Sequence, residues 1–81
     1  MYNVRLGQLV IVCWDDICTD AGWNDPAKIE LGHAKTVGYV SHLRPNALVI
    51  SSGGMDGKLD GDPTIIPWGN ITEIIILEIV E

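Results

Sequence analysis

Residues 62–80 read DPTIIPWGNITEIIILEIV, and this stretch decides the fold that the sequence predicts. The short apolar segment 64–66 is interrupted by residues 67–70 (PWGN) and followed at once by a long β-branched run over 71–80. Proline and glycine interrupt regular structure, whereas isoleucine and valine favour strands. The stretch therefore predicts a strand, one tight turn and a second strand, which together form the closing corner of a small β-barrel.

Three upstream segments, residues 9–14, 34–43 and 47–52, also have the apolar, β-branched composition of strands. Gly38 lies in the middle of the second segment and predicts a bend or bulge, the device that curls a sheet. Residues 20–32 are rich in turn formers and predict a short helical or irregular insertion after the first strand. We therefore expect a mainly β protein in which residues 1–81 form a single, strongly bent, five-stranded barrel domain.

The composition limits the location and the partners of the chain. Its 81 residues carry eleven acids and five bases, which gives a formal net charge of −6. No apolar run approaches the roughly 18 residues of a membrane span, and the N-terminus does not resemble a signal peptide. We expect a cytoplasmic protein with no membrane partner. The acidic balance and the scattered bases also argue against a nucleic-acid partner, because phosphate binding requires lysine and arginine.

The order of three segments, 36–40, 48–50 and 66–71, resembles the strand order of Sm-like and Src-homology-3-like (SH3-like) small barrels. In Sm-like proteins the corner usually carries an Arg-Gly pair that helps to grip RNA. This chain has Trp68-Gly69 at that position. The resemblance thus implies a barrel with that corner geometry, while the substitution argues against RNA binding.

A second resemblance spans nearly the whole chain. The pairs Trp-Asp at 14–15 and Gly-Trp at 22–23, the run Thr-Val-Gly-Tyr at 36–39 and Ile-Pro-x-Gly at 66–69 are together similar to a family of small bacteriophage-encoded proteins. This resemblance implies a phage accessory protein that acts in the cytoplasm of a host bacterium.

The sequence suggests a ligand-binding site at one end of the barrel, formed where Asp15, Asp16, Trp23, Ser52 and Asp62 could meet. Aromatic faces next to fixed polar groups can hold a flat ligand, and the glycine-rich loop 53–62 could supply backbone amides. The simpler interpretation is that the tryptophans fill the core or cover a barrel end and that the aspartates bond loop amides. Both interpretations stay open at this point.

No catalytic or metal site is predicted, so we expect a protein that is not an enzyme and needs no cofactor. Cys13 and Cys18 lack the spacing of a zinc site and are expected to be reduced thiols. Residues 56–62 contain three aspartates, but Lys58 stands where a calcium loop needs a ligand. We therefore expect loop 53–62 to be mobile and solvated.

The last strand predicts self-association. Regular alternation puts Ile71 and Ile75 on one face and Ile74 and Ile76 on the other, so both faces are apolar. A small barrel has one interior, and the second face needs a cover. We expect a homo-oligomer, most simply a dimer, with Trp68, Ile74 and Ile76 at the interface.

Three functions are compatible with these expectations. The first is a non-catalytic phage protein that binds and blocks a host factor or sequesters a small host defence signal, such as a nucleotide. The second is a structural or adaptor barrel in phage assembly. The third is an Sm-like nucleic-acid-binding protein, which the net charge and the missing corner arginine disfavour.

Overall fold

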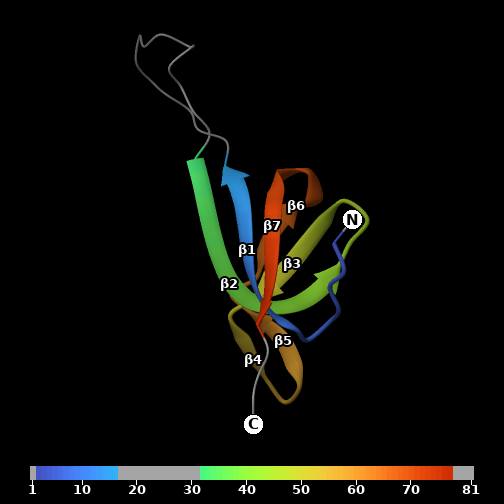
Figure 1. The fold of residues 1–81 in the computed structure, drawn as a ribbon. Helices are drawn as coiled ribbons and strands as arrows, with labels where there is room; N and C mark the ends of the chain where they lie inside the picture. Colours follow the sequence, from blue (N-terminus) through green and yellow to red (C-terminus); the bar gives the residue numbers. More distant parts are fainter. Residues whose placement is uncertain (1, 17–31, 78–81) are drawn as a thin grey trace, which may run out of the picture.

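The computed structural model describes residues 2–16 and 32–77, and this part of the chain is mainly β (Figure 1). The strands are β1 (Leu9–Asp16), β2 (Gly32–Leu43), β3 (Ala47–Ser51), β4 (Gly53–Met55), β5 (Lys58–Gly61), β6 (Thr64–Pro67) and β7 (Ile71–Leu77). The predicted helical or irregular insertion, Trp23 and Cys18 lie outside the described residues. No helix in the described part is long and apolar enough to span a membrane.

Five of these strands form one antiparallel sheet in the order β6-β3-β2-β1-β7. They correspond to the five strands that the sequence predicts. Within the described residues, however, β6 and β7 do not pair with each other and remain the two edges of the sheet. The sheet is therefore open, and the described residues do not form the closed barrel that was expected.

The strands β4 and β5 form a separate two-stranded hairpin where the sequence analysis predicted a mobile loop. The segment is therefore a strand pair and not an irregular loop, while most of its residues are exposed to solvent, as expected. Asp56 and Gly57 join the two strands with φ angles of 53° and 78°. Positive φ at both central residues is the requirement of a type I′ turn, and Asp-Gly is a preferred sequence for it. The Asp56-Gly57 dipeptide is therefore the sequence signal from which this hairpin could have been predicted.

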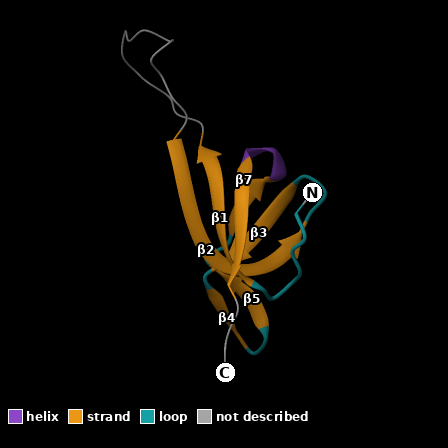
Figure 2. Ribbon diagram, in the orientation of Figure 1, coloured by secondary structure: helices purple, strands orange, loops and turns teal. Residues whose placement is uncertain are grey.

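The predicted corner is present as η2 (Trp68–Asn70), a single 3₁₀ turn between β6 and β7 (Figure 2). Pro67 precedes it with extended backbone, and Ile71 resumes the extended conformation directly after it. One helical turn is enough to move the chain from the β3 side of the sheet to the β1 side, because β6 pairs with β3 and β7 pairs with β1.

The core lies on one face of the bent sheet, which we call the inner face. Its buried members come from five strands: Val10, Val12, Val40, Leu48, Ile50, Ile66 and Ile71. Burial of each such side chain stabilises the fold by about 1.5–3 kcal/mol. The buried Ser51 hydroxyl lies within 2.6 Å of the Gly53 and Gly61 carbonyl oxygens, and thereby attaches the β4–β5 hairpin to β3.

The bend of β2 has two sources. Gly38 is buried, and a Cβ atom there would lie 2.7 Å from the Ser51 carbonyl oxygen, so the two backbones approach closely. The pairing of β2 with β3 then shifts register between Val40 and His42. The predicted bend is confirmed, with the bulge a few residues after the glycine. Figure 1 shows β2 curving across the sheet in its second half.

A second bulge sets the faces of β7. Ile74 and Ile76 pair with Val12 and Val10, which places them on the inner face, and Ile74 packs against the core. The register shifts between Cys13 and Trp14, so that Ile71 pairs with Trp14 and is also buried. The expectation that Ile71 shares a face with Ile75 was wrong because regular alternation ignores this bulge.

Candidate functional site

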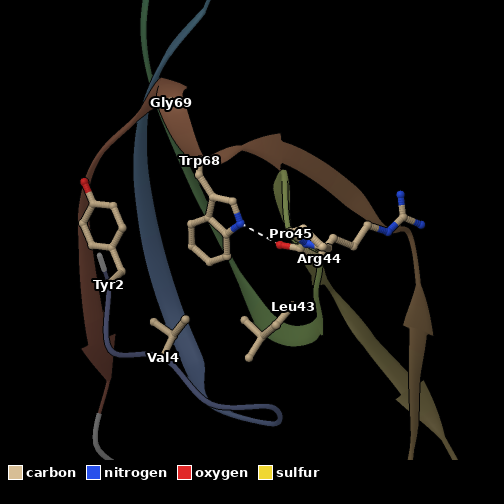
Figure 3. Close-up of a pocket in the computed structure, with 7 residues that line it drawn as sticks. All are labelled: Tyr2, Val4, Leu43, Arg44, Pro45, Trp68 and Gly69. Carbon is tan, nitrogen blue, oxygen red and sulfur yellow. Dashed lines mark hydrogen bonds between the residues drawn. The ribbon is translucent and has the colours of Figure 1, made fainter.

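Two aromatic side chains, Tyr2 and Trp68, lie side by side at the corner of the sheet (Figure 3). Their ring centroids are 6.4 Å apart and their planes are inclined by 17°, so the rings are stacked. The Tyr2 hydroxyl donates a hydrogen bond of 2.9 Å to the Ile71 carbonyl oxygen. This bond holds the N-terminal segment against the start of β7.

Trp68 is fixed from a second direction by the turn between β2 and β3. Its indole Nε1–H donates to the Arg44 carbonyl oxygen at 2.8 Å, and its backbone N–H donates to the Asn46 carbonyl oxygen at 3.3 Å. The turn itself is closed by the Arg44 N–H, which donates to the Ala47 carbonyl oxygen. The expected turn at 44–46 therefore also positions the corner tryptophan.

These elements enclose a pocket with a cavity volume of about 840 Å³. Its walls are mainly aliphatic and aromatic. They are formed by Tyr2, Val4, Leu43, Arg44, Pro45, Trp68 and Gly69. The volume falls within the range of small-ligand pockets, and mostly apolar walls with a few polar atoms are typical of them.

The pocket carries little charge. Arg44 is the one ionisable cation among its lining residues, and Figure 3 shows its side chain extending away from Trp68. The Arg44 guanidinium makes no ion pair with another described residue. The polar atoms of Tyr2 and Trp68 are already bonded to backbone carbonyls. The pocket is therefore suited to an uncharged, apolar or planar group.

The structure places Asp15 and Asp16 at the end of β1, next to η2 but not among the residues that line the pocket. Asp15 faces His33 across the strands, and its Oδ1 lies 2.7 Å from His33 Nδ1. The imidazole is 82% exposed, so the pair contributes little to stability. The Asp15 carbonyl oxygen accepts a hydrogen bond from the Asn70 side chain, which ties this end of β1 to η2.

Ser52 and Asp62 lie at the opposite end of the sheet, on either side of the β4–β5 hairpin. Tyr39 pairs with both Leu9 and Ser51, so Ser52 lies near the start of β1. Asp15 is six residues further along that strand, or about 20 Å at roughly 3.3 Å per residue. The register therefore separates these residues, and the single meeting point that we expected is not formed.

The individual binding roles of these four aspartate and serine residues stay predictions. Asp62 has a left-handed φ of 44° immediately before Pro63, which explains an aspartate there by turn geometry alone. Trp14 packs against the core and donates its indole N–H to Thr36 Oγ1 at 2.8 Å. The packing interpretation therefore holds for Trp14.

No group of three or more metal-ligating side chains occurs within residues 2–16 and 32–77. Cys13 is a half-buried free thiol on the face opposite the core.

Trp68 was expected from the sequence to be an interface residue, but the residues that surround it were not expected to form a site. Tyr2 and Val4 belong to an N-terminal segment in which no pattern was interpreted, and Leu43 and Pro45 were assigned only to a strand end and a turn. The alternation of Tyr2 and Val4 was a weak signal for a segment with one apolar face. Nothing local links residue 2 to residue 68, because only the folded sheet brings them together.

Comparisons with protein-family models, with curated proteins and with solved structures found no match for this chain.

Proposed function

We propose that the protein is a non-catalytic binding protein that holds an apolar segment of a partner protein in the Tyr2–Trp68 pocket. The observation that carries this proposal is the apolar lining, together with the engagement of both aromatic polar groups in backbone hydrogen bonds. A fixed aromatic surface loses little entropy on binding, and tryptophan and tyrosine are enriched among residues that dominate interfaces.

The resemblance to small phage-encoded proteins supplies the biological setting of the proposal. In that setting the partner is a host factor that the protein blocks inside the bacterial cytoplasm. The alternative setting is an adaptor in phage assembly, and it would use the same pocket with a phage protein as the partner.

The fold proposal that accompanies this function is a bent sheet of the SH3-like or Sm-like class. Its support is the strand order β6-β3-β2-β1-β7, the short turn between β2 and β3 and the 3₁₀ corner before the last strand. An Sm-like grip on RNA has less support, because Trp68 occupies the corner and donates its indole N–H to the Arg44 carbonyl.

A nucleotide is the second candidate ligand. The aromatic pair could stack on a base, and such stacking contributes about 1–3 kcal/mol per base. The pocket offers no charged group directed inward for a phosphate, because the Arg44 side chain extends away from it. This geometry favours the apolar segment of a protein over a nucleotide.

Placing a charge in the pocket tests the proposal. Leu43 lines the pocket and is 45% exposed, so Leu43→Glu should leave the fold intact while introducing a carboxylate beside Trp68. The matched control is Leu6→Glu, because Leu6 is 64% exposed and does not line the pocket. Circular dichroism should be the same for both variants and the unchanged chain.

The binding measurement uses two probes. A displayed library of random dodecapeptides is selected on the unchanged protein, and the four nucleoside monophosphates are titrated by calorimetry. We expect selected peptides with apolar anchors, which Leu43→Glu should weaken by about tenfold or more and Leu6→Glu should not. Peptides that bind both variants equally would contradict the proposal. If instead a nucleoside monophosphate binds the unchanged protein and Leu6→Glu but not Leu43→Glu, the pocket binds a nucleotide.

A further inference from the structure

The face of the sheet opposite the core, which we call the outer face, is apolar over β2, β1 and β7. Cross-strand pairing arranges its side chains in rows that run perpendicular to the strands. Two adjacent rows are apolar, namely Val37–Ile11–Ile75 and Tyr39–Leu9–Leu77. Val37 is 57% exposed and Ile75 is 39% exposed, and the other four side chains are half-buried. The described residues leave this surface without a full cover.

The next row carries two opposite charges. Cys13 pairs with Lys35 on β2 and with Glu73 on β7, so the row reads Lys35–Cys13–Glu73. Both charged side chains are exposed, and they form no ion pair with each other. Neighbouring strands lie about 4.8 Å apart, which puts Lys35 and Glu73 nearly 10 Å apart on either side of β1.

This arrangement is complementary to itself under one particular symmetry. Consider a two-fold axis that runs parallel to β1 and lies above Cys13. This axis exchanges the β2 side and the β7 side of β1, and it leaves each row at the same position along the strand. Lys35 then lies over Glu73 of the second copy, and Glu73 over its Lys35. The apolar rows lie over the same apolar rows, and Asp15, at the end of β1 beside His33, lies over its own copy. Such an interface is isologous, since the same patch is used by both copies.

The other two-fold axis in the plane of the interface is disfavoured. An axis perpendicular to the strands through Cys13 would place Lys35 over Lys35 and Glu73 over Glu73. An axis of the same direction through Ile11 would place the charged row over the apolar row Tyr39–Leu9–Leu77. Like charges in contact and unpaired charges on apolar surface both oppose association.

We propose that the protein forms a two-fold dimer in which the outer faces of two copies pack with their β1 strands alongside each other and Lys35 of each copy meets Glu73 of the other. Sheets packed in this way lie about 10 Å apart, with strands inclined by about 30°. The interface differs from the one that the sequence suggested, because Ile74 and Ile76 lie on the inner face. The proposal does not rest on the proposed function, since the Tyr2–Trp68 pocket lies elsewhere.

Charge exchange between two populations of the full chain tests this dimer. Lys35→Glu alone creates two Glu–Glu contacts, and Glu73→Lys alone creates two Lys–Lys contacts. In a 1:1 mixture, a heterodimer of the two variants restores two opposite-charge contacts. An ion pair within one copy could not be restored by mixing.

We expect sedimentation at tens of micromolar to show a dimer for the unchanged chain. Each single variant should dissociate about tenfold or more readily, and the mixture should return to within about threefold of the unchanged chain. Mass spectrometry of a mixture with one variant labelled by ¹⁵N should show the mixed species. Both positions are exposed, and circular dichroism checks that each variant is folded.

The matched controls are Lys58→Glu and Asp60→Lys, which make the same charge changes on β5. Each control should dimerise alone as the unchanged chain does. A monomeric unchanged chain at these concentrations overturns the proposal. Single variants that dimerise normally, or a mixture of folded variants that stays monomeric, overturn it as well.

Discussion

Gly38 is one of the described residues at which neighbouring backbone leaves no room for a side chain. The Ser51 carbonyl oxygen would lie 2.7 Å from a Cβ atom at this position, and backbone cannot yield as a flexible side chain can. The glycine therefore permits β2 to approach β3 closely at the point where the sheet begins to bend.

We predict that Gly38→Ala lowers the free energy of unfolding by about 1–3 kcal/mol, the usual cost of forcing an extra methyl group into a packed site. Urea denaturation followed by circular dichroism measures the change. Gly53→Ala is the matched control, because a Cβ atom there would meet nothing within 4 Å. Equal effects of the two substitutions would show that close approach is not what position 38 requires.

At the same scale, the role of Trp68 could be predicted only in part. Its place between Pro67 and Gly69 indicated a corner, and in the fold it packs against the core and lines the pocket. Its stacking with Tyr2 could not be predicted, since no local pattern connects residues so distant in sequence.

The elements of the main sheet follow from composition, whereas the β4–β5 hairpin does not. β4 and β5 contain glycines and charged residues instead of β-branched residues, so strand propensity fails there. The turn chemistry of Asp56-Gly57 and the contact of the Ser51 hydroxyl with the Gly53 and Gly61 carbonyl oxygens determine this hairpin. The prediction that Asp15 and Ser52 lie close together was wrong for a related reason. The distance between them is set by the pairing of β1, β2 and β3, which no local sequence pattern reveals.

We predict that Gly57→Ala weakens the hairpin by about 1–2 kcal/mol, because its φ of 78° lies in the left-handed region that a Cβ atom disfavours. The effect should be confined to β4 and β5, which pair only with each other in the described sheet. Amide hydrogen exchange measures it residue by residue. Faster exchange across β1 and β3 as well would contradict an independent hairpin.

The whole molecule is organised by contacts between the two ends of the described chain. Leu9 pairs with Leu77, and the Tyr2 hydroxyl reaches the Ile71 carbonyl oxygen. Loop closure must occur before such contacts can form, so the sheet should assemble slowly for its size.

We predict a refolding time of milliseconds to seconds, the range of domains dominated by non-local strand pairing. Stopped-flow dilution from urea, followed by tryptophan fluorescence, measures this time. Repeating the experiment over a range of protein concentrations separates folding of one chain from association. Refolding within microseconds would contradict the expectation that non-local strand pairing limits the folding rate.

The bulge between Cys13 and Trp14 has a consequence for the uniqueness of the fold. The run Ile74-Ile75-Ile76 is apolar at successive positions, so a slip of β7 by one residue would exchange its faces at little hydrophobic cost. Three hydrogen bonds at the start of the strand oppose such a slip: from Tyr2 to Ile71, from Thr72 to Cys13 and from Asn70 to Asp15. Polar side chains at one end of β7 thus select a single alignment for a strand whose apolar residues would accept more than one.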